Sequence, residues 1–157
     1  MKTVNEYKYL GVIVQCNGMD DLDISRQIQT TYIQGNCIIH KFRGCSDYVK
    51  VQLFKTYCYN MYGSQLWAKY STGVLDRLRV AFNNVFRIFM SIDRRASVSQ
   101  AFIQRHVYHF KVLQRKIVFG FRTRLLNSGN LIVRGIVNSP YFIYGSALNA
   151  QWRKVLF

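Results

Sequence analysis

Hydrophobic residues have one spacing in the first fifteen positions of the chain and a different spacing after them. Aromatic and aliphatic residues mark Val4–Tyr9 and Val12–Gln15, and the Leu10-Gly11 step between them allows a bend that a β-carbon at Gly11 would obstruct. We therefore expect a short β-hairpin here. Almost no other strand pattern follows, so the hairpin lacks neighbours for its backbone donors and acceptors. This favours a chain that is one piece of something larger.

From about residue 21 onward, apolar residues recur every three or four positions, which is the period of an amphipathic helix. Turn and capping residues such as Asn17-Gly18, Ser46, Ser97 and Ser139-Pro140 separate the helical runs. The predicted helices cover about 21–42, 46–70, 74–90, 97–106, 110–126 and 131–137. The aromatic tail, 141–157, has no assigned element. The predicted fold class is mainly α: a short N-terminal β-hairpin followed by a bundle of about five or six helices.

Composition indicates a folded domain with a sizeable core. Half of the 157 residues are apolar and there is a single Pro, which favours long helices over disorder. Apolar residues at helical spacing are interpreted as core, namely Phe82, Phe86, Phe89, Phe110, Leu113 and Ile117. No apolar run reaches about eighteen residues, so no membrane span is expected, and the first residues lack the apolar core of a secretory signal.

Four cysteines are present, and their spacing matches no zinc-binding pattern. They are Cys16, Cys37, Cys45 and Cys58. We interpret them as free thiols in a reducing compartment, the nucleus or the cytoplasm.

Charge is distributed unevenly along the chain, whose formal net charge is +15. Residues 1–40 carry a net charge of −1, whereas residues 73–125 carry eleven basic residues against Asp76 and Asp93, a net charge of +9. Nine of those eleven are Arg, whose planar fork suits phosphate oxygens. Such a field attracts polyanions. A solvated or ribosomal-type basic surface and a membrane surface remain alternatives. Nucleic acid is favoured because aromatic residues that could stack on bases lie nearby: Tyr57, Tyr59, Tyr62, Trp67 and Tyr70.

An ordered set of short motifs carries a family resemblance over about residues 4–95. The motifs are, in order, Tyr7-Lys8-Tyr9-Leu10-Gly11, Asp23-Ile24-x-x-x-Ile28, Lys50-x-x-Leu53-x-x-x-Tyr57, Tyr62-Gly63-Ser64-Gln65-Leu66-Trp67, Leu75-x-x-Leu78-x-x-x-Phe82 and Asn84-x-Phe86-Arg87-x-Phe89. Together they resemble the segment that follows the catalytic palm in reverse transcriptases of non-LTR (LINE-type) retrotransposons, where a Tyr-Leu-Gly hairpin leads into thumb and linker helices.

The resemblance implies a domain order and a set of nucleic-acid contacts. Residues 1–18 would be the hairpin at the end of a palm, 19–95 the thumb-like helices and 96–157 a basic helical linker. The hairpin would act as a primer grip and the helices would track a duplex backbone; an ordinary edge element packed on the helices is the alternative for the hairpin. The candidate nucleic-acid-binding residues are Tyr9, Leu10, Gly11, Arg77, Arg79, Arg87, Arg94, Arg95, Arg105, Lys111, Arg115 and Lys116.

No catalytic, metal-binding or cofactor-binding residue is assigned. Polymerisation needs carboxylates that hold two Mg²⁺ ions. Gly18-Met19-Asp20-Asp21 lacks the Tyr of the family's Tyr-x-Asp-Asp signature and follows the Tyr-Leu-Gly strand instead of preceding it, so these acids are interpreted as helix N-terminal charges. His106 and His109 could share a helix face, but no further ligand follows at metal spacing. We expect no polymerisation by this chain alone.

Two functions follow from these observations. The favoured one is a C-terminal piece of a reverse transcriptase-like protein, without the catalytic palm, that binds RNA or an RNA–DNA duplex as primer-template and pairs with a missing palm and fingers. The alternative is a basic helical scaffold domain that binds an acidic protein.

Overall fold

The computed structural model describes residues 4–157 as a two-stranded hairpin followed by a largely helical chain. Its elements are β1 (Glu6–Tyr9), β2 (Val12–Gln15), α1 (Asp21–Phe42), α2 (Asp47–Cys58), the 3-10 turn η1 (Ser64–Leu66), α3 (Thr72–Phe89), α4 (Val98–Gln104), α5 (Phe110–Leu126), α6 (Leu131–Val137), the π-helical turn η2 (Tyr141–Gly145) and α7 (Ala147–Leu156). The predicted fold class is confirmed, with more helical segments than expected. The first three residues of the predicted segment 1–18 lie outside the described residues.

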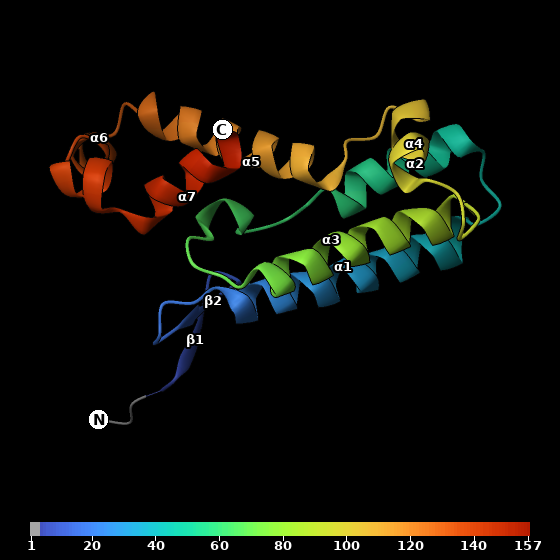
Figure 1. Ribbon diagram of the computed structural model, residues 1–157, viewed down its shortest axis with the longest axis horizontal. Coiled ribbons are helices and arrows are strands. Elements are labelled where there is room, and N and C mark those ends of the chain that lie inside the picture. Colours follow the sequence, from blue (N-terminus) through green and yellow to red (C-terminus); the bar gives the residue numbers. More distant parts are fainter. Residues whose placement is uncertain (1–3) are drawn as a thin grey trace.

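The helices form two layers beside the hairpin. Figure 1 shows α1 and α3 lying side by side, with α5 and α7 stacked on the other side of α3 and the hairpin at the end where α1 begins. The short helices α2 and α4 cover the opposite end of this pair, and α6 lies beyond α5. None of the helices described for residues 4–157 combines the length and the apolarity needed to cross a lipid bilayer.

The hairpin closes through a two-residue turn. β1 and β2 pair antiparallel, with Tyr9 opposite Val12, and both turn residues have positive φ, 46° at Leu10 and 83° at Gly11. Two successive positive φ angles match the right-handed twist of a hairpin. The Tyr62 hydroxyl donates to the Leu10 carbonyl over 2.8 Å, so the turn is fastened to the segment after α2.

Close contact between α1 and α3 depends on a glycine. A β-carbon placed on Gly35 of α1 would lie only 2.5 Å from Cγ1 of Val85 on α3. Both residues are buried. Gly35, which weakens the helical pattern in the sequence, is therefore the residue that lets the two longest helices approach each other.

The core is built around a cluster of phenylalanine rings. Phe86 stacks on Phe102 with ring centroids 4.4 Å apart, while Phe54 meets Phe82 and Phe86 edge to face at 5.1 and 4.9 Å. Phe110 at the start of α5 joins the cluster through Phe82. The predicted core residues are confirmed: five are buried, and Ile117 packs against them half-buried. The cluster includes residues on both sides of position 95, where the boundary between thumb-like helices and linker is predicted. The domain boundaries stay a prediction.

The predicted helix over 46–70 is wrong in its second half. The helix ends at Cys58, and Gly63 has a φ of +84°, which no helix accommodates. The freed carbonyls of this irregular segment are taken up by α1, since Gln27 donates to Asn60 O over 3.1 Å and Arg26 to Tyr62 O over 3.1 Å. Tertiary hydrogen bonds thus replace the helical ones that the periodicity predicted.

Helix ends elsewhere agree more closely with the sequence pattern. α5 begins at 110 and α6 at 131, as predicted, and Ser97 caps α4 by accepting from Gln100 N. Ser46 occupies the N-cap position of α2 but its side chain makes no capping hydrogen bond. The unassigned tail forms η2 and α7, and Ser146 caps α7 by accepting from Asn149 N.

A fully buried carboxylate connects the hairpin, α1 and the segment before α3. Asp23 is 0% exposed and accepts from Ile13 N of β2 (3.0 Å), from Arg26 Nε (2.7 Å) and from the Trp67 indole Nε1 (2.8 Å). Each bond involves an ionised acceptor, which makes it stronger than a neutral one. Asp23 is therefore more than a helix N-terminal charge.

The two neighbouring acids continue this connection. Asp20 Oδ2 accepts from the backbone N–H groups of Ala68 (2.7 Å) and Lys69 (2.9 Å), and Asp21 Oδ1 accepts from Ser71 N (2.8 Å). The three carboxylates together hold the segment that leads into α3 against the start of α1.

The substitution Asp23→Asn tests this connection. The amide has the size of the carboxylate but exchanges one acceptor oxygen for a donor, so at least one buried N–H loses its partner. We expect a loss of about 2–4 kcal/mol in the free energy of unfolding, measured by urea denaturation. The control is Asp76→Asn, whose carboxylate is exposed and paired with Arg79 at 3.1 Å; there the change should stay within about 0.5 kcal/mol. Equal effects of the two substitutions would contradict the assignment.

A pair of glycine substitutions tests the contact between α1 and α3. Gly35→Ala should destabilise the fold by about 1–3 kcal/mol, because the new methyl group overlaps Val85. Gly135→Ala, in a helix with open space around the residue, should instead be neutral or stabilising by up to about 1 kcal/mol. Thermal unfolding followed by circular dichroism compares the two; a stabilised Gly35→Ala variant would refute the close approach.

Candidate nucleic-acid interface

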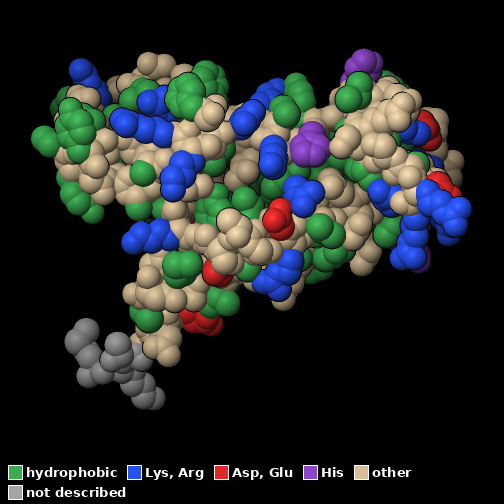
Figure 2. All heavy atoms as spheres, viewed as in Figure 1, with side chains coloured by type: hydrophobic (Ala, Val, Ile, Leu, Met, Phe, Trp, Pro, Cys, Tyr) green, Lys and Arg blue, Asp and Glu red, His purple; other side chains and the backbone are tan. Residues whose placement is uncertain are grey.

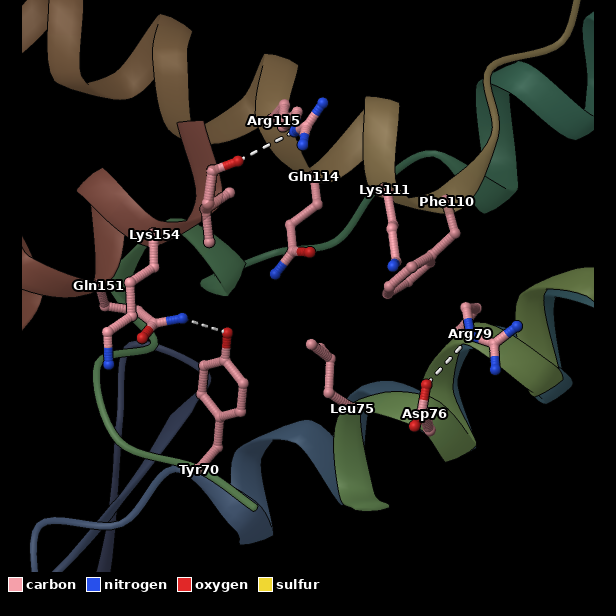
Figure 3. A pocket seen from close by; sticks show the side chains of 11 residues that line it. Tyr70, Leu75, Asp76, Arg79, Phe110, Lys111, Gln114, Arg115, Gln151 and Lys154 are labelled. Carbon is pink, nitrogen blue, oxygen red and sulfur yellow. Dashed lines mark hydrogen bonds and ion pairs between the residues drawn. The ribbon is translucent and has the colours of Figure 1, made fainter. Parts of the chain in front are cut away.

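A basic cavity of about 250 Å³ lies between α3, α5 and α7 (Figure 3). Its lining is Tyr70, Leu75, Asp76, Arg79, Phe110, Lys111, Gln114, Arg115, Gln151, Lys154 and Val155. Lys111 and Arg115 stand four residues apart, so they project from one face of α5. Arg79 comes from α3 and Lys154 from the last turn of α7. Three elements distant in sequence therefore place four cations around one cavity.

The cations of this cavity are only weakly compensated. Asp76 is the acid in its lining and pairs with Arg79 through a 3.1 Å contact that is largely exposed to solvent. Within residues 4–157, Lys111, Arg115 and Lys154 form no ion pair. Arg115 Nε donates to Val155 O over 3.0 Å, which leaves its two terminal nitrogens free of protein hydrogen bonds in the part of the chain described and ties α5 to α7. An anion placed here would meet several unengaged donors.

The inner wall of the cavity is polar and half-buried. Gln151 donates to the Tyr70 hydroxyl over 2.6 Å, and the Gln114 amide beside them is 7% exposed. Burial raises the pKa of Tyr70, while hydrogen bonding by Gln151 and the nearby Gln114 amide act in the opposite direction. The hydroxyl is therefore protonated at neutral pH.

A buried tryptophan fixes α7 in its place beside the cavity. Trp152 is 1% exposed and donates from Nε1 to Gln65 O over 2.8 Å. Its ring also meets Phe121 of α5 and Phe142 edge to face. Lys154, two residues further on, owes its position to this anchor.

The structure brings together three of the predicted basic residues, Arg79, Lys111 and Arg115. Arg77 projects from α3 toward a shallow surface that it shares with Ile28 and Tyr32 of α1. Arg94 and Arg95 are exposed in the turn that follows α3, at the other end of that helix. Figure 2 shows Lys and Arg side chains spread over much of one face, with few acidic side chains among them.

Three other predicted cations are engaged within the chain. Arg87 Nη1 donates to the carbonyls of Asp93 (2.8 Å) and Arg94, which braces the turn after α3. Arg105 pairs with Asp47 at 3.3 Å and joins α2 to the end of α4. Lys116 Nζ lies 4.0 Å from the centre of the Tyr108 ring and donates to its hydroxyl over 2.8 Å. Sequence alone does not separate these structural roles from free charges.

Of the predicted primer-grip residues, Tyr9 ends β1, and Leu10 and Gly11 form the hairpin turn. Tyr9 is 62% exposed and Leu10 is 73% exposed. Gly11 has the positive φ that its position requires, and a β-carbon there would approach the Tyr62 ring to 3.3 Å. The Leu10 carbonyl is already bound by Tyr62.

The candidate stacking residues separate into exposed and buried ones. Tyr57 and Tyr62 are 45% and 50% exposed. Trp67, by contrast, is 3% exposed and bonded to Asp23, so its interpretation as a base-stacking residue is wrong. The Tyr59 hydroxyl accepts from Tyr108 N over 2.6 Å, and burial raises the pKa of Tyr59.

The histidine pair does not share a helix face. His106 has a φ of +52° between α4 and α5, and His109 caps α5 by accepting from Lys111 N. Across residues 4–157, no group of three or more His, Cys, Asp and Glu side chains gathers as metal ligands. The four cysteines are free thiols, and burial raises the pKa of Cys58 to about 12, which keeps it protonated.

Sequence reasoning missed Lys154, Gln151 and Gln114. The first two lie in the unassigned tail, although Ser146 followed by apolar residues at 148, 152 and 155 was a usable helix signal. Gln114 is a polar residue in an otherwise apolar helix face, and its role follows only from the cavity that it lines.

No protein-family model, curated protein or solved structure matches this chain.

The pKa of His109 reports on the charge of the cavity. Burial, together with the positive charges of Arg79 and Lys111, lowers this pKa below the usual 6.5. The folded state thus binds the proton less readily than the unfolded chain does, so His109 opposes folding increasingly as the pH falls through 6.5.

Nuclear magnetic resonance titration of the imidazole tests this. We expect the His109 pKa to rise when inorganic phosphate is added, because a bound anion offsets the two cations. Arg79→Gln with Lys111→Gln should raise the pKa without phosphate and remove its response. A phosphate response that persists in that double variant would place the anion elsewhere.

Proposed function

We propose that this chain binds the sugar–phosphate backbone of RNA or of an RNA–DNA duplex, in the manner of a thumb-like region of a reverse transcriptase-like protein. The observation that carries the proposal is the set of four cations from α3, α5 and α7 around one cavity, whose lining among residues 4–157 includes one acid, Asp76. The proposal assigns binding, and no polymerisation, to this chain.

The chemistry of these cations suits phosphate. Arg115 offers two terminal nitrogens and the two lysines offer compact charges without protein partners among the described residues. A backbone that passes over α5 would exchange its condensed counterions for these groups, which makes affinity fall steeply with salt. The basic residues spread across the same face would extend the contact.

The hairpin supports the family part of the proposal. The Tyr-Leu-Gly step forms a tight turn at the end of the molecule where α1 begins, with exposed Tyr9 and Leu10 side chains. In the proposed arrangement this turn contacts a primer end, while the helices contact the duplex.

The alternative partner is an acidic protein that docks on the same basic surface. The two alternatives differ in salt dependence and in the need for a regular phosphate spacing. A protein partner would leave binding to a nucleic-acid duplex weak and unchanged by substitutions in the cavity.

A charge-matched pair of triple variants tests the proposal. Lys111→Gln, Arg115→Gln and Lys154→Gln together should weaken binding to an RNA–DNA duplex on the order of 10- to 100-fold at low salt, measured by fluorescence anisotropy. The slope of log affinity against log salt should become shallower by about 2–3. The control, Lys41→Gln with Arg43→Gln and Arg134→Gln, removes the same charge from exposed sites outside the cavity and should change affinity only slightly.

Three results would contradict the proposal. These are duplex binding that does not weaken between low and moderate salt, equal losses in the two triple variants, and nucleotide incorporation by this chain alone. The first two concern the surface and the third concerns the assignment of a purely binding role.

A further inference from the structure

Gln114 lines the basic cavity but has no role in the proposed binding of a sugar–phosphate backbone. Gln114 is 7% exposed, and Figure 3 shows its side chain pointing from α5 into the cavity. Its amide lies within hydrogen-bonding reach of the Tyr70 hydroxyl, whose pKa it helps to lower, and that hydroxyl also accepts a 2.6 Å bond from Gln151. That contact engages one amide donor, so the second donor and the carbonyl oxygen remain open to the cavity, where a ligand or water can bond them.

The walls around this amide are of two kinds. Leu75 and Phe110 supply apolar surface and Lys111, Arg115 and Lys154 supply positive charge; Figure 3 shows Lys111 beside Phe110 and Lys154 at the opposite side beside Gln151. A ligand that fits both must carry a flat apolar part with hydrogen-bonding edges and an anionic part. A nucleoside monophosphate has this combination.

We propose that the cavity binds one nucleoside monophosphate unit, with the phosphate on the cations at one side of the cavity and the base edge on Gln114. The amide can donate and accept side by side, which is the pattern that pairs with the N6 and N7 atoms of adenine. The volume of about 250 Å³ lies just below the range of drug-sized sites and admits one nucleotide, not two.

The unit must be unpaired, because a base in a duplex is stacked between its neighbours and paired with its partner, so it cannot enter a cavity of this size. An unpaired nucleotide can come from a single-stranded extension of a bound duplex or from the free mononucleotide. We favour the single-stranded extension. This choice rests on the proposed function, because the adjoining duplex would lie on the surrounding basic face.

The substitution Gln114→Leu separates this inference from backbone binding. Leu keeps the approximate size and removes the amide, and an apolar residue is compatible with the buried position. The affinity for an RNA–DNA duplex with a five-adenine single-stranded extension should fall about tenfold, whereas the affinity for the blunt duplex should stay within about twofold. The matched control is Gln104→Leu, at an exposed position of α4, which should change neither affinity.

A second measurement works on the unmodified protein. Adenosine monophosphate should shift the nuclear magnetic resonance signals of the Gln114 side-chain amide, and inorganic phosphate or adenosine at the same concentration should shift them far less. Shifts with the mononucleotide but no binding of either duplex would identify the free nucleotide as the source and would refute the proposed function instead. The inference is overturned if Gln114→Leu leaves the extended duplex unaffected, if it weakens both duplexes equally, or if phosphate alone reproduces the amide shifts.

Discussion

The buried carboxylate of Asp23 is the interaction on which the arrangement of this molecule depends. It receives hydrogen bonds from the hairpin, from α1 itself and from Trp67. Three different parts of the chain, a strand, a helix and an irregular segment, therefore meet at one carboxylate. Because a buried charge without partners is strongly unfavourable, none of the three donors can leave independently. Asp23 thus holds both β2 and the irregular segment before α3 against the first turn of α1.

Apolar packing between the helices then positions the residues of the basic cavity relative to α1. Gly35 allows α3 to approach α1, and the phenylalanine cluster sets α5 against α3 through Phe82 and Phe110. Trp152 fixes α7 against η1 and α5. The positions of Arg79, Lys111, Arg115 and Lys154 are the outcome of these apolar contacts, since the cations themselves repel one another.

Net charge is a poor guide to where such a site lies. The basic residues between 73 and 125 have three different roles: Arg87 braces a turn, Arg105 joins two helices, and Lys111 projects into the cavity without an ion pair among the described residues. A structural cation costs the protein stability when it is removed, whereas a free one costs affinity for an anion. The charge pattern therefore indicates a binding surface only after cations engaged within the fold have been separated from cations free to bind an anion.

The sequence by itself determined the fold class, the bounds of α1, α5 and α6, and the burial of Phe82, Phe86, Phe89 and Phe110, because periodicity and capping residues act over a few neighbouring positions. It could not place the break after Cys58, where hydrogen bonds from Gln27 and Arg26 outweigh the local helical pattern. Nor could it assemble the cavity, whose lining comes from positions as far apart as Tyr70 and Lys154. Tertiary structure decided these features because they depend on contacts between distant segments. Whether a carboxylate is buried, a glycine meets another helix or a cation stays exposed is settled only once those segments have packed together.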